Sequence, residues 1–348
     1  MTLSCGSKFL VATDKGICCI GRFVIKTHVC VSLCTTEVNL ERTYDMYARP
    51  FTKEIEKKAR DELNETPGHR EEFLRNFREW IQTEYRVQCR PEGLWLLNYV
   101  RGCKFCNQTV KKKFTNFVKL ETAAPEMFSN RDPLLPEIQE ILRKGAIIPF
   151  GTPDKECVIV KWDVFEFDKV DFYDVMKVAM MVMDVFMNEN DTCMVIGHYV
   201  IVDFKGFSLS LLKQLTPFTL KKIFYNIFLS YPCRIKALYF VNCPGYVQTL
   251  FGLAKPFISK KLGSRTSFYG ENFEEVFSVI PRRYFPTEYG GNDESIDDII
   301  GNWKIIIEGY RDWFLEDLAN TNDRSRVKDK NSYNSYDIQG SFKKLDID

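Results

Sequence analysis

The stretch YPCRIKALYFVNCPGYVQTLFGLAKPFISKKLGSRTSFYG, residues 231–270, decides the fold of this chain. It begins as a strand in which Arg234 and Lys236, two residues apart, lie on one face. The opposite face is apolar and holds Ile235, Ala237, Tyr239 and Val241. Because Leu238 and Phe240 are apolar as well, the pattern predicts a central strand that is covered on both faces.

A break at residues 242–245, Asn-Cys-Pro-Gly, ends this strand, and an apolar helix is predicted to follow it. Its apolar residues recur with the spacing i, i+3, i+4 and are Val247, Leu250, Phe251, Ala254, Phe257 and Ile258. The basic residues Lys260, Lys261 and Arg265 come next. Such a helix is suited to cover an apolar space on one side while its basic flank faces an anionic surface.

The composition is that of a globular protein with a sizeable core. The chain has 348 residues, 45% of them hydrophobic and 28 of them Phe, which is enough for one large domain or two ordinary ones. The net charge of +1 argues against binding nucleic acid over a broad surface. The chain has no uninterrupted apolar run of about 18 residues, as a membrane span needs, and no signal-peptide core. We therefore expect a cytosolic protein.

Cysteine is frequent, but its spacing indicates neither a disulfide framework nor a metal site. The chain has 12 Cys and 3 His. Cys103 and Cys106 form one C-x-x-C pair, and no second pair follows at the spacing of zinc ligands. We expect free thiols in a reducing compartment and no bound metal.

The sequence pattern changes several times along the chain. Residues 1–45 hold five of the cysteines without a helical period, and we interpret them as an atypical leader or a gene-model extension, with Met46 as an alternative start. A helical lobe is predicted over 46–145 and an α/β domain over 146–295. A C-terminal helix is predicted over 296–319, followed by a disordered tail over 320–348.

The α/β domain is predicted from strands that alternate with helices. We expect strands over 157–162 and 194–204 and helices over 172–187 and 216–228. The helix over 172–187 carries five methionines: Met176, Met180, Met181, Met183 and Met187. Methionines at this density fill a core or form the adaptable wall of a pocket for an apolar ligand.

Catalytic motifs are weak. No G-x-G-x-x-G follows a strand, and there is no Walker loop. The nearest approach to a nucleophile elbow is residues 206–210, with Ser208 as nucleophile and His198 and Asp203 as partners, but Ser210 stands where the second glycine is needed. We therefore do not expect an enzyme, and an α/β hydrolase is the least favoured alternative.

The chain resembles the CRAL-TRIO lipid carriers, in particular the group of the α-tocopherol transfer protein and the retinaldehyde-binding protein with its insect members. The resemblance covers about 52–314. The matching segments, in chain order, are YVRGCKF at 99–105, FSNRDP at 128–133, YDVMK at 173–177, VDFKG at 202–206, TP at 216–217, YP at 231–232, KPF at 255–257 and PTEYGG at 286–291.

The resemblance implies a helical N-terminal lobe followed by a CRAL-TRIO α/β/α domain, with an apolar cavity under a mobile lid helix at residues 246–262. By position, the implied cavity lining is Ala179, Met183, Val200, Val202, Ile223, Ile227, Tyr231, Ile235, Leu238, Val247, Leu250, Ala254 and Phe257. A basic cleft beside the lid that binds phosphoinositide headgroups is implied for Arg234, Lys236, Lys261 and Arg265.

The implied function is that of a monomeric cytosolic carrier, with a bound lipid rather than a cofactor. It would take a tocopherol-, retinoid- or terpenoid-like ligand and dock reversibly on phosphoinositide-containing membranes. A phosphoinositide-responsive regulatory module without transfer activity is the alternative. The chain departs from the family pattern at Lys205 and Ser210, and His198 and Asn226 bring polarity close to the implied pocket. These departures bear on which ligand is bound.

Overall fold

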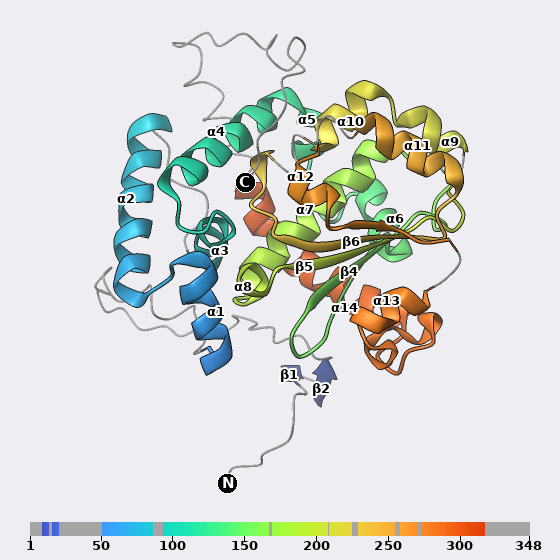
Figure 1. Cartoon of the computed structure of the whole chain (residues 1–348), viewed down its shortest axis with the longest axis horizontal. Coiled ribbons are helices and arrows are strands. Elements are labelled where there is room, and N and C mark those ends of the chain that lie inside the picture. The colour runs from blue at the N-terminus through green and yellow to red at the C-terminus, as the bar shows by residue number, and fades with distance from the viewer. Residues whose placement is uncertain are drawn as a thin grey trace.

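The computed structural model describes residues 9–13, 16–20, 51–85, 93–166, 169–207, 209–224, 229–254, 258–270 and 273–316. A short hairpin, β1 (Phe9–Thr13) and β2 (Gly16–Ile20), lies within the predicted leader. The helical lobe follows (Figure 1) and consists of α1 (Lys53–Leu63), α2 (Pro67–Tyr85), α3 (Leu94–Gly102), α4 (Asn107–Ala123), α5 (Pro125–Phe128) and α6 (Pro136–Lys144). The predicted tail over 320–348 lies outside the described residues.

The second part of the chain is built on a five-stranded sheet of order β3-β4-β5-β6-β7. Its strands are β3 (Ile147–Gly151), β4 (Glu156–Lys161), β5 (His198–Asp203), β6 (Ile235–Val241) and β7 (Thr266–Phe268). Only the pair β3–β4 is antiparallel among these strands, and the other pairs are parallel. This mixed helical and sheet fold confirms the predicted fold class, and β6 occupies the interior of the sheet as its sequence indicates.

Helices connect the strands and cover the sheet. They are α7 (Phe172–Glu189), α8 (Cys193–Ile196), α9 (Leu209–Gln214), α10 (Pro217–Phe224), α11 (Gly245–Ala254), α12 (Lys260–Gly263), α13 (Glu274–Val279) and α14 (Ile296–Gly309), with short turns η4 (Arg282–Tyr284) and η5 (Thr287–Tyr289). In Figure 1, α9, α10 and α11 lie together on one side of the sheet, and α13 lies on the other.

A bulge in β6 alters the predicted faces of this strand. His198 pairs with Ile235 and Tyr199 pairs with Ala237, so Lys236 is the extra residue on β6. The prediction that Ile235 shares a face with Ala237 is therefore wrong. Ile235 instead lines the same cavity as Leu238 and Phe240 on the other side of the bulge.

Three predicted elements are interrupted in the structure. Residues 193–196 form the helix α8 rather than the start of a strand, and Gly197, with φ +81°, turns the chain into β5. The lid predicted as one helix over 246–262 is divided, because Ser259 has extended backbone and caps a separate helix, α12. The C-terminal helix turns at Tyr310, and residues 311–316 are helical again.

The carboxylate of Asp184, fully buried on α7, connects the helical lobe to the α/β domain. It forms an ion pair with the buried guanidinium of Arg131 from the segment before α6. It also accepts hydrogen bonds from Trp95 Nε1 on α3 at 3.0 Å and from the Tyr231 hydroxyl at 3.1 Å. A buried charge is tolerated only when it is paired and hydrogen-bonded, so this arrangement determines how α7 sits against its neighbours.

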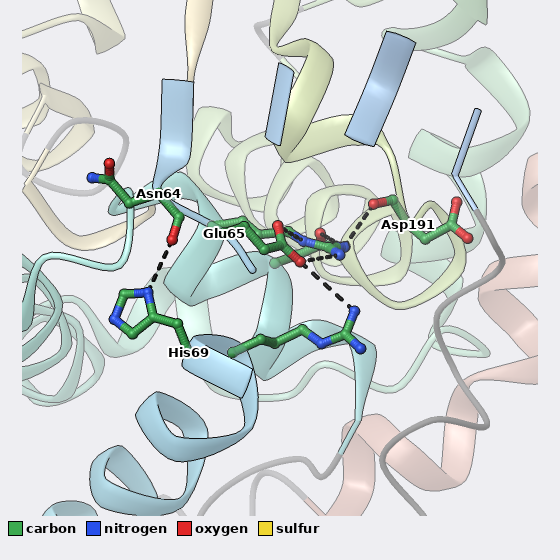
Figure 2. A network of polar contacts seen from close by, with 7 residues as sticks. Asn64, Glu65, His69 and Asp191 are labelled. Atoms are coloured by element: carbon green, nitrogen blue, oxygen red, sulfur yellow. Dashed lines mark hydrogen bonds and ion pairs between the residues drawn. The ribbon is translucent and has the colours of Figure 1, made fainter. Parts of the chain in front are cut away.

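A second buried network holds the end of α1 (Figure 2). The guanidinium of Arg101 on α3 donates two hydrogen bonds to Glu65, at 2.8 and 2.7 Å, and one to the Asp191 carbonyl at 2.8 Å. Asn64 ends α1 in the left-handed conformation, and its carbonyl lies 2.9 Å from His69 Nδ1. The bidentate pair fixes both the distance and the orientation of α1 relative to α3.

We predict that Asp184→Asn strongly destabilises the protein. The substitution keeps the shape of the side chain but removes the negative charge that pairs with the buried Arg131 guanidinium, which costs about 3 kcal/mol or more of the free energy of unfolding. Trp95→Phe, which removes one hydrogen bond, serves as the milder control at about 1 kcal/mol. Urea denaturation measures both, and an Asp184→Asn variant no less stable than Trp95→Phe contradicts this account.

Candidate functional site: an apolar cavity beside a basic cluster

A cavity of about 380 Å³ lies between one face of the sheet and the helices that cover it. The sheet contributes alternate residues of its strands, as expected for side chains on one face: Ile147, Pro149, Val158, Val160, His198, Val200, Val202, Ile235, Leu238 and Phe240. Helix α7 forms the largest part of the opposite wall, with Phe172, Val175, Met176, Ala179, Met180, Val182, Met183 and Phe186. Leu220 and Ile223 of α10 and Val247 and Phe251 of α11 contribute as well.

The residues implied by the family resemblance lie largely around this cavity. Nine of the thirteen line it: Ala179, Met183, Val200, Val202, Ile223, Tyr231, Ile235, Leu238 and Val247. Ile227 and Phe257 lie outside the described residues. Leu250 and Ala254 belong to α11, and their side chains are not among those described.

One end of the cavity is aromatic, which the sequence reasoning missed. Trp162 and Phe204 follow directly after β4 and β5, and Phe240 lies near the end of β6. Phe207 and Phe251 complete this end. Because the carboxyl ends of parallel strands meet at one edge of a sheet, aromatic residues as the last residues of the two predicted strands over 157–162 and 194–204 were a usable signal.

The methionines of α7 divide between the cavity and the core. Met176, Met180 and Met183 line the cavity, whereas Met181 and Met187 are fully buried and are not part of its lining. Both roles suggested by their density in the sequence are therefore present on one helix. The helical period turns Met181 away from the cavity, whereas Met187 lies about three turns after Met176 on the same face and is buried near the end of the helix.

The residues considered for a hydrolase do not form a triad. His198 and Asp203 stand at opposite ends of β5, and Ser208 lies outside the described residues. The Asp203 carboxylate accepts hydrogen bonds from Asn242 Nδ2 at 2.7 Å and from the Tyr289 hydroxyl at 2.7 Å. Asp203 thus anchors the loop after β6 and the segment around η5, which is a structural role.

Glu62 on α1 bridges two of the four implied phosphoinositide-binding residues. Arg234 donates to Glu62 Oε2 at 2.6 Å, and Lys236 donates to the same oxygen at 2.8 Å. Partial burial acts to raise the pKa of Glu62, but the hydrogen bonds and charges of Lys236 and Arg234 lower it to about 2. The carboxylate therefore stays ionised and partly neutralises both cations.

The other two residues lie close by. Arg265 donates to the Ile235 carbonyl at 2.5 Å, between Arg234 and Lys236 in sequence. Lys104 on the turn after α3 has a lowered pKa, first because of burial and then because of repulsion by Lys261 and Arg234. The same two causes, burial and then repulsion by Lys236, lower the pKa of Lys58 on α1.

We define the basic cluster as Lys58, Lys104, Arg234, Lys236, Lys261 and Arg265, with Glu62 at its centre. The helical lobe supplies Lys58, Lys104 and Glu62, and the α/β domain supplies the rest. Lys58 and Lys104 were not identified from the sequence, because nothing in the chain pattern places α1 and the end of α3 beside β6.

The residues that the structure describes contain no candidate metal site and no candidate membrane-spanning helix. No group of three or more His, Cys, Asp or Glu side chains among them is arranged to hold a metal ion. Within the same residues, no helix is long and apolar enough to cross a bilayer. In the C-x-x-C pair, burial raises the pKa of Cys103 to about 12, whereas hydrogen bonds with Thr109 lower the pKa of the exposed Cys106.

An α/β domain that keeps an apolar chamber open between its sheet and its covering helices has the architecture of a binding protein for a small hydrophobic molecule. Comparison with known families agrees. The CRAL/TRIO domain model matches residues 142–291, and the model of the Pinta-like UBA domain matches residues 66–138.

Individual relatives cover most of the chain. Alpha-tocopherol transfer protein-like from Homo sapiens is 25% identical over 278 residues, 78% of this chain and 80% of that protein. Clavesin-1 from Mus musculus is 25% identical over 322 residues, 90% of this chain and 86% of that protein. The solved structure of Sfh5 overlaps 58% of this chain and 72% of its own, with a TM-score of 0.42 and 14% identity. Residues 142–291 therefore form a CRAL-TRIO domain, and the chain is homologous to alpha-tocopherol transfer protein-like and to clavesin-1.

We predict that acidification destabilises the protein partly through His198, which lines the cavity. Burial, followed by the nearby charge of Arg234, lowers the pKa of His198 from 6.5 to about 4. The unfolded chain therefore binds a proton at higher pH than the folded one, and stability is lost as the pH falls from about 6.5 to about 4. The loss is roughly 3 kcal/mol in the free energy of unfolding.

The control is His198→Phe, which has no titrating group at this position. Urea denaturation at pH 7 and pH 4.5 is expected to show a smaller loss of stability in this variant than in the wild type. Equal losses in the two proteins contradict the assignment of the effect to His198.

Proposed function

We propose that this protein is a monomeric carrier that binds one small hydrophobic lipid and transfers it between membranes. The ligand is tocopherol-, retinoid- or terpenoid-like and occupies the cavity between the sheet and α7. The observation that carries the proposal is the cavity itself, about 380 Å³ in volume and lined almost entirely by apolar side chains. This volume lies in the range of small-molecule sites. The similarity to alpha-tocopherol transfer protein-like from Homo sapiens supports the transfer step.

Burial of the lipid supplies the binding energy. At about 25 cal/mol per Å², a ligand that buries a few hundred Å² of apolar surface is stabilised by several kcal/mol. Such a gain makes spontaneous release slow, so a carrier needs a segment that opens. Helix α11 is the candidate, because Val247 and Phe251 face the cavity while Tyr246 is 43% exposed on the outer side.

The basic cluster is the proposed docking site for phosphoinositide headgroups. Lys261 lies on α12, which follows the lid helix α11, so an anion held by the cluster acts close to the segment that opens. Each cation near an anionic membrane contributes about 1 kcal/mol of attraction. An incoming phosphate must compete with the Glu62 carboxylate for Arg234 and Lys236. Docking therefore replaces the ion pairs that Arg234 and Lys236 form with Glu62 by ion pairs with the lipid phosphate. Because Glu62 lies on α1, this exchange weakens the contact between α1 and β6.

We predict that filling the cavity abolishes carriage. Ala179→Trp places a large side chain into the chamber from α7, and vesicle-to-vesicle transfer of a fluorescent tocopherol or retinoid is expected to fall at least about tenfold. Ile305→Trp is the matched control, because Ile305 is 63% exposed on α14. A normal transfer rate for Ala179→Trp at unchanged secondary structure refutes the cavity as the lipid site. Binding without transfer in the wild type instead supports a regulatory module.

We also predict opposite effects from the two signs of charge in the basic cluster. Replacing Arg234, Lys236, Lys261 and Arg265 with Ala is expected to weaken binding to phosphoinositide-containing vesicles at least about tenfold. Glu62→Gln is expected to strengthen it about fivefold, since the competing carboxylate is lost. The charge-matched control replaces Arg143, Lys144, Lys169 and Lys304, which belong to other elements. Vesicle sedimentation measures all three variants, and the docking role is refuted if the two four-residue variants bind equally.

A further inference from the structure

His198 is the one histidine among the largely apolar residues that line the cavity. It is 2% exposed, and among the described residues neither Nδ1 nor Nε2 has a hydrogen-bond partner. Its only ring contact described is with Phe186, at 5.7 Å between centroids. A buried polar group without a partner is costly, and such groups are rare in native structures. The cavity is the space in which a partner for this imidazole can be found.

The position of His198 defines one end of the chamber. It is the first residue of β5, and Val200, Val202 and Phe204 follow on the same face of the strand. The distance along the strand from His198 to Phe204 is roughly 20 Å, at 3.3 Å per residue. Phe204 belongs to the aromatic end of the cavity, and His198 lies at the opposite end. The other residues that this strand segment contributes to the lining, Val200, Val202 and Phe204, are apolar.

Two other polar groups nearby, the Tyr231 hydroxyl and the Arg234 guanidinium, have partners of their own. The Tyr231 ring lines the cavity, but its hydroxyl donates to Asp184 behind the wall. The Arg234 guanidinium donates to the carbonyls of Met194 and Val195, at 2.6 and 2.9 Å, and to Glu62. The backbone of His198 is held as well, since its N–H donates to the Arg234 carbonyl at 2.7 Å. The backbone at His198 is therefore fixed, while neither ring nitrogen is hydrogen-bonded within the described residues.

The charge state of the ring limits the chemistry of that ligand. With its pKa lowered to about 4, the imidazole is neutral at physiological pH and offers one N–H donor and one nitrogen acceptor. A hydroxyl group matches both, and a carbonyl oxygen matches the donor. A carboxylate would bury a charge in an apolar chamber beside a neutral ring, which is strongly unfavourable.

We propose that His198 is the subsite for a single uncharged oxygen, a hydroxyl or carbonyl, at the end of an elongated apolar lipid whose chain extends toward the aromatic end. This inference rests on the proposed carrier function and specifies its ligand class. His198 acts here as a specificity-determining residue, because a ligand without the oxygen leaves the imidazole unpaired.

The test compares probes that differ only at the terminal group: 1-hexadecanol, hexadecane and palmitate. Their binding is measured at pH 7.5 by displacement of the neutral fluorophore N-phenyl-1-naphthylamine from the full-length protein. The wild type is expected to bind the alcohol at least about tenfold more tightly than the alkane, and palmitate most weakly. His198→Phe is expected to lose about tenfold in affinity for the alcohol while its affinity for the alkane is unchanged.

His198→Gln is the matched variant, since its amide keeps a donor and an acceptor, and it is expected to retain most of the preference for the alcohol. Alkane binding reports whether each variant is folded. The inference is overturned if His198→Phe keeps the wild-type ratio of alcohol to alkane affinity, or if wild type binds palmitate best. A wild-type protein that binds none of the probes overturns the carrier function itself, which separates the two failures.

Discussion

The buried carboxylate of Asp184 is the constraint on which the rest of the structure depends. It holds α7 through Arg131 and Trp95, which do not line the cavity, and through the hydroxyl of Tyr231, whose ring does. A chamber cannot be held open by side chains that fill it, because filling removes the space. The helix that forms its wall must therefore be held by contacts outside the cavity. The ion pair and the two hydrogen bonds of Asp184 hold α7 in a fixed geometry. Tyr231 belongs to both sides, since its ring faces the cavity and its hydroxyl faces Asp184.

The helical lobe supports α7 and also contributes Glu62 to the basic cluster. Helix α1 is anchored by the buried pair of Glu65 and Arg101, and one turn earlier it presents Glu62 to Arg234 and Lys236. The buried pair is shielded from water and salt, whereas the Glu62 contacts are only partly buried. An external anion can therefore compete for the outer contacts while the inner anchor holds. If the basic cluster docks on a membrane as proposed, this difference in burial lets the lobe respond without unfolding.

Several features of the fold followed directly from local patterns. The apolar helix α7 and the buried strand β6 are properties of short segments, which chemistry within a few residues decides. The resemblance to the CRAL-TRIO carriers implied thirteen residues of the cavity lining, and nine of them line the cavity. The bulge at Lys236 was not visible, because it depends on the register between β5 and β6 rather than on either sequence alone.

The sequence by itself determined the α/β class of the domain and the basic residues around 231–265, since these follow from composition and period, and its resemblance to the CRAL-TRIO carriers implied the apolar pocket. Only the tertiary structure decided which charges meet. Glu62 lies more than 170 residues before Arg234 and Lys236, and Lys104 joins the same cluster from the end of α3. Likewise, the sequence shows His198 only as a polar residue on an apolar strand. The tertiary structure places it at one end of the cavity, where its ring nitrogens have no hydrogen-bond partner among the described residues. Contacts between distant segments carry no local signal, because they depend on how whole elements pack.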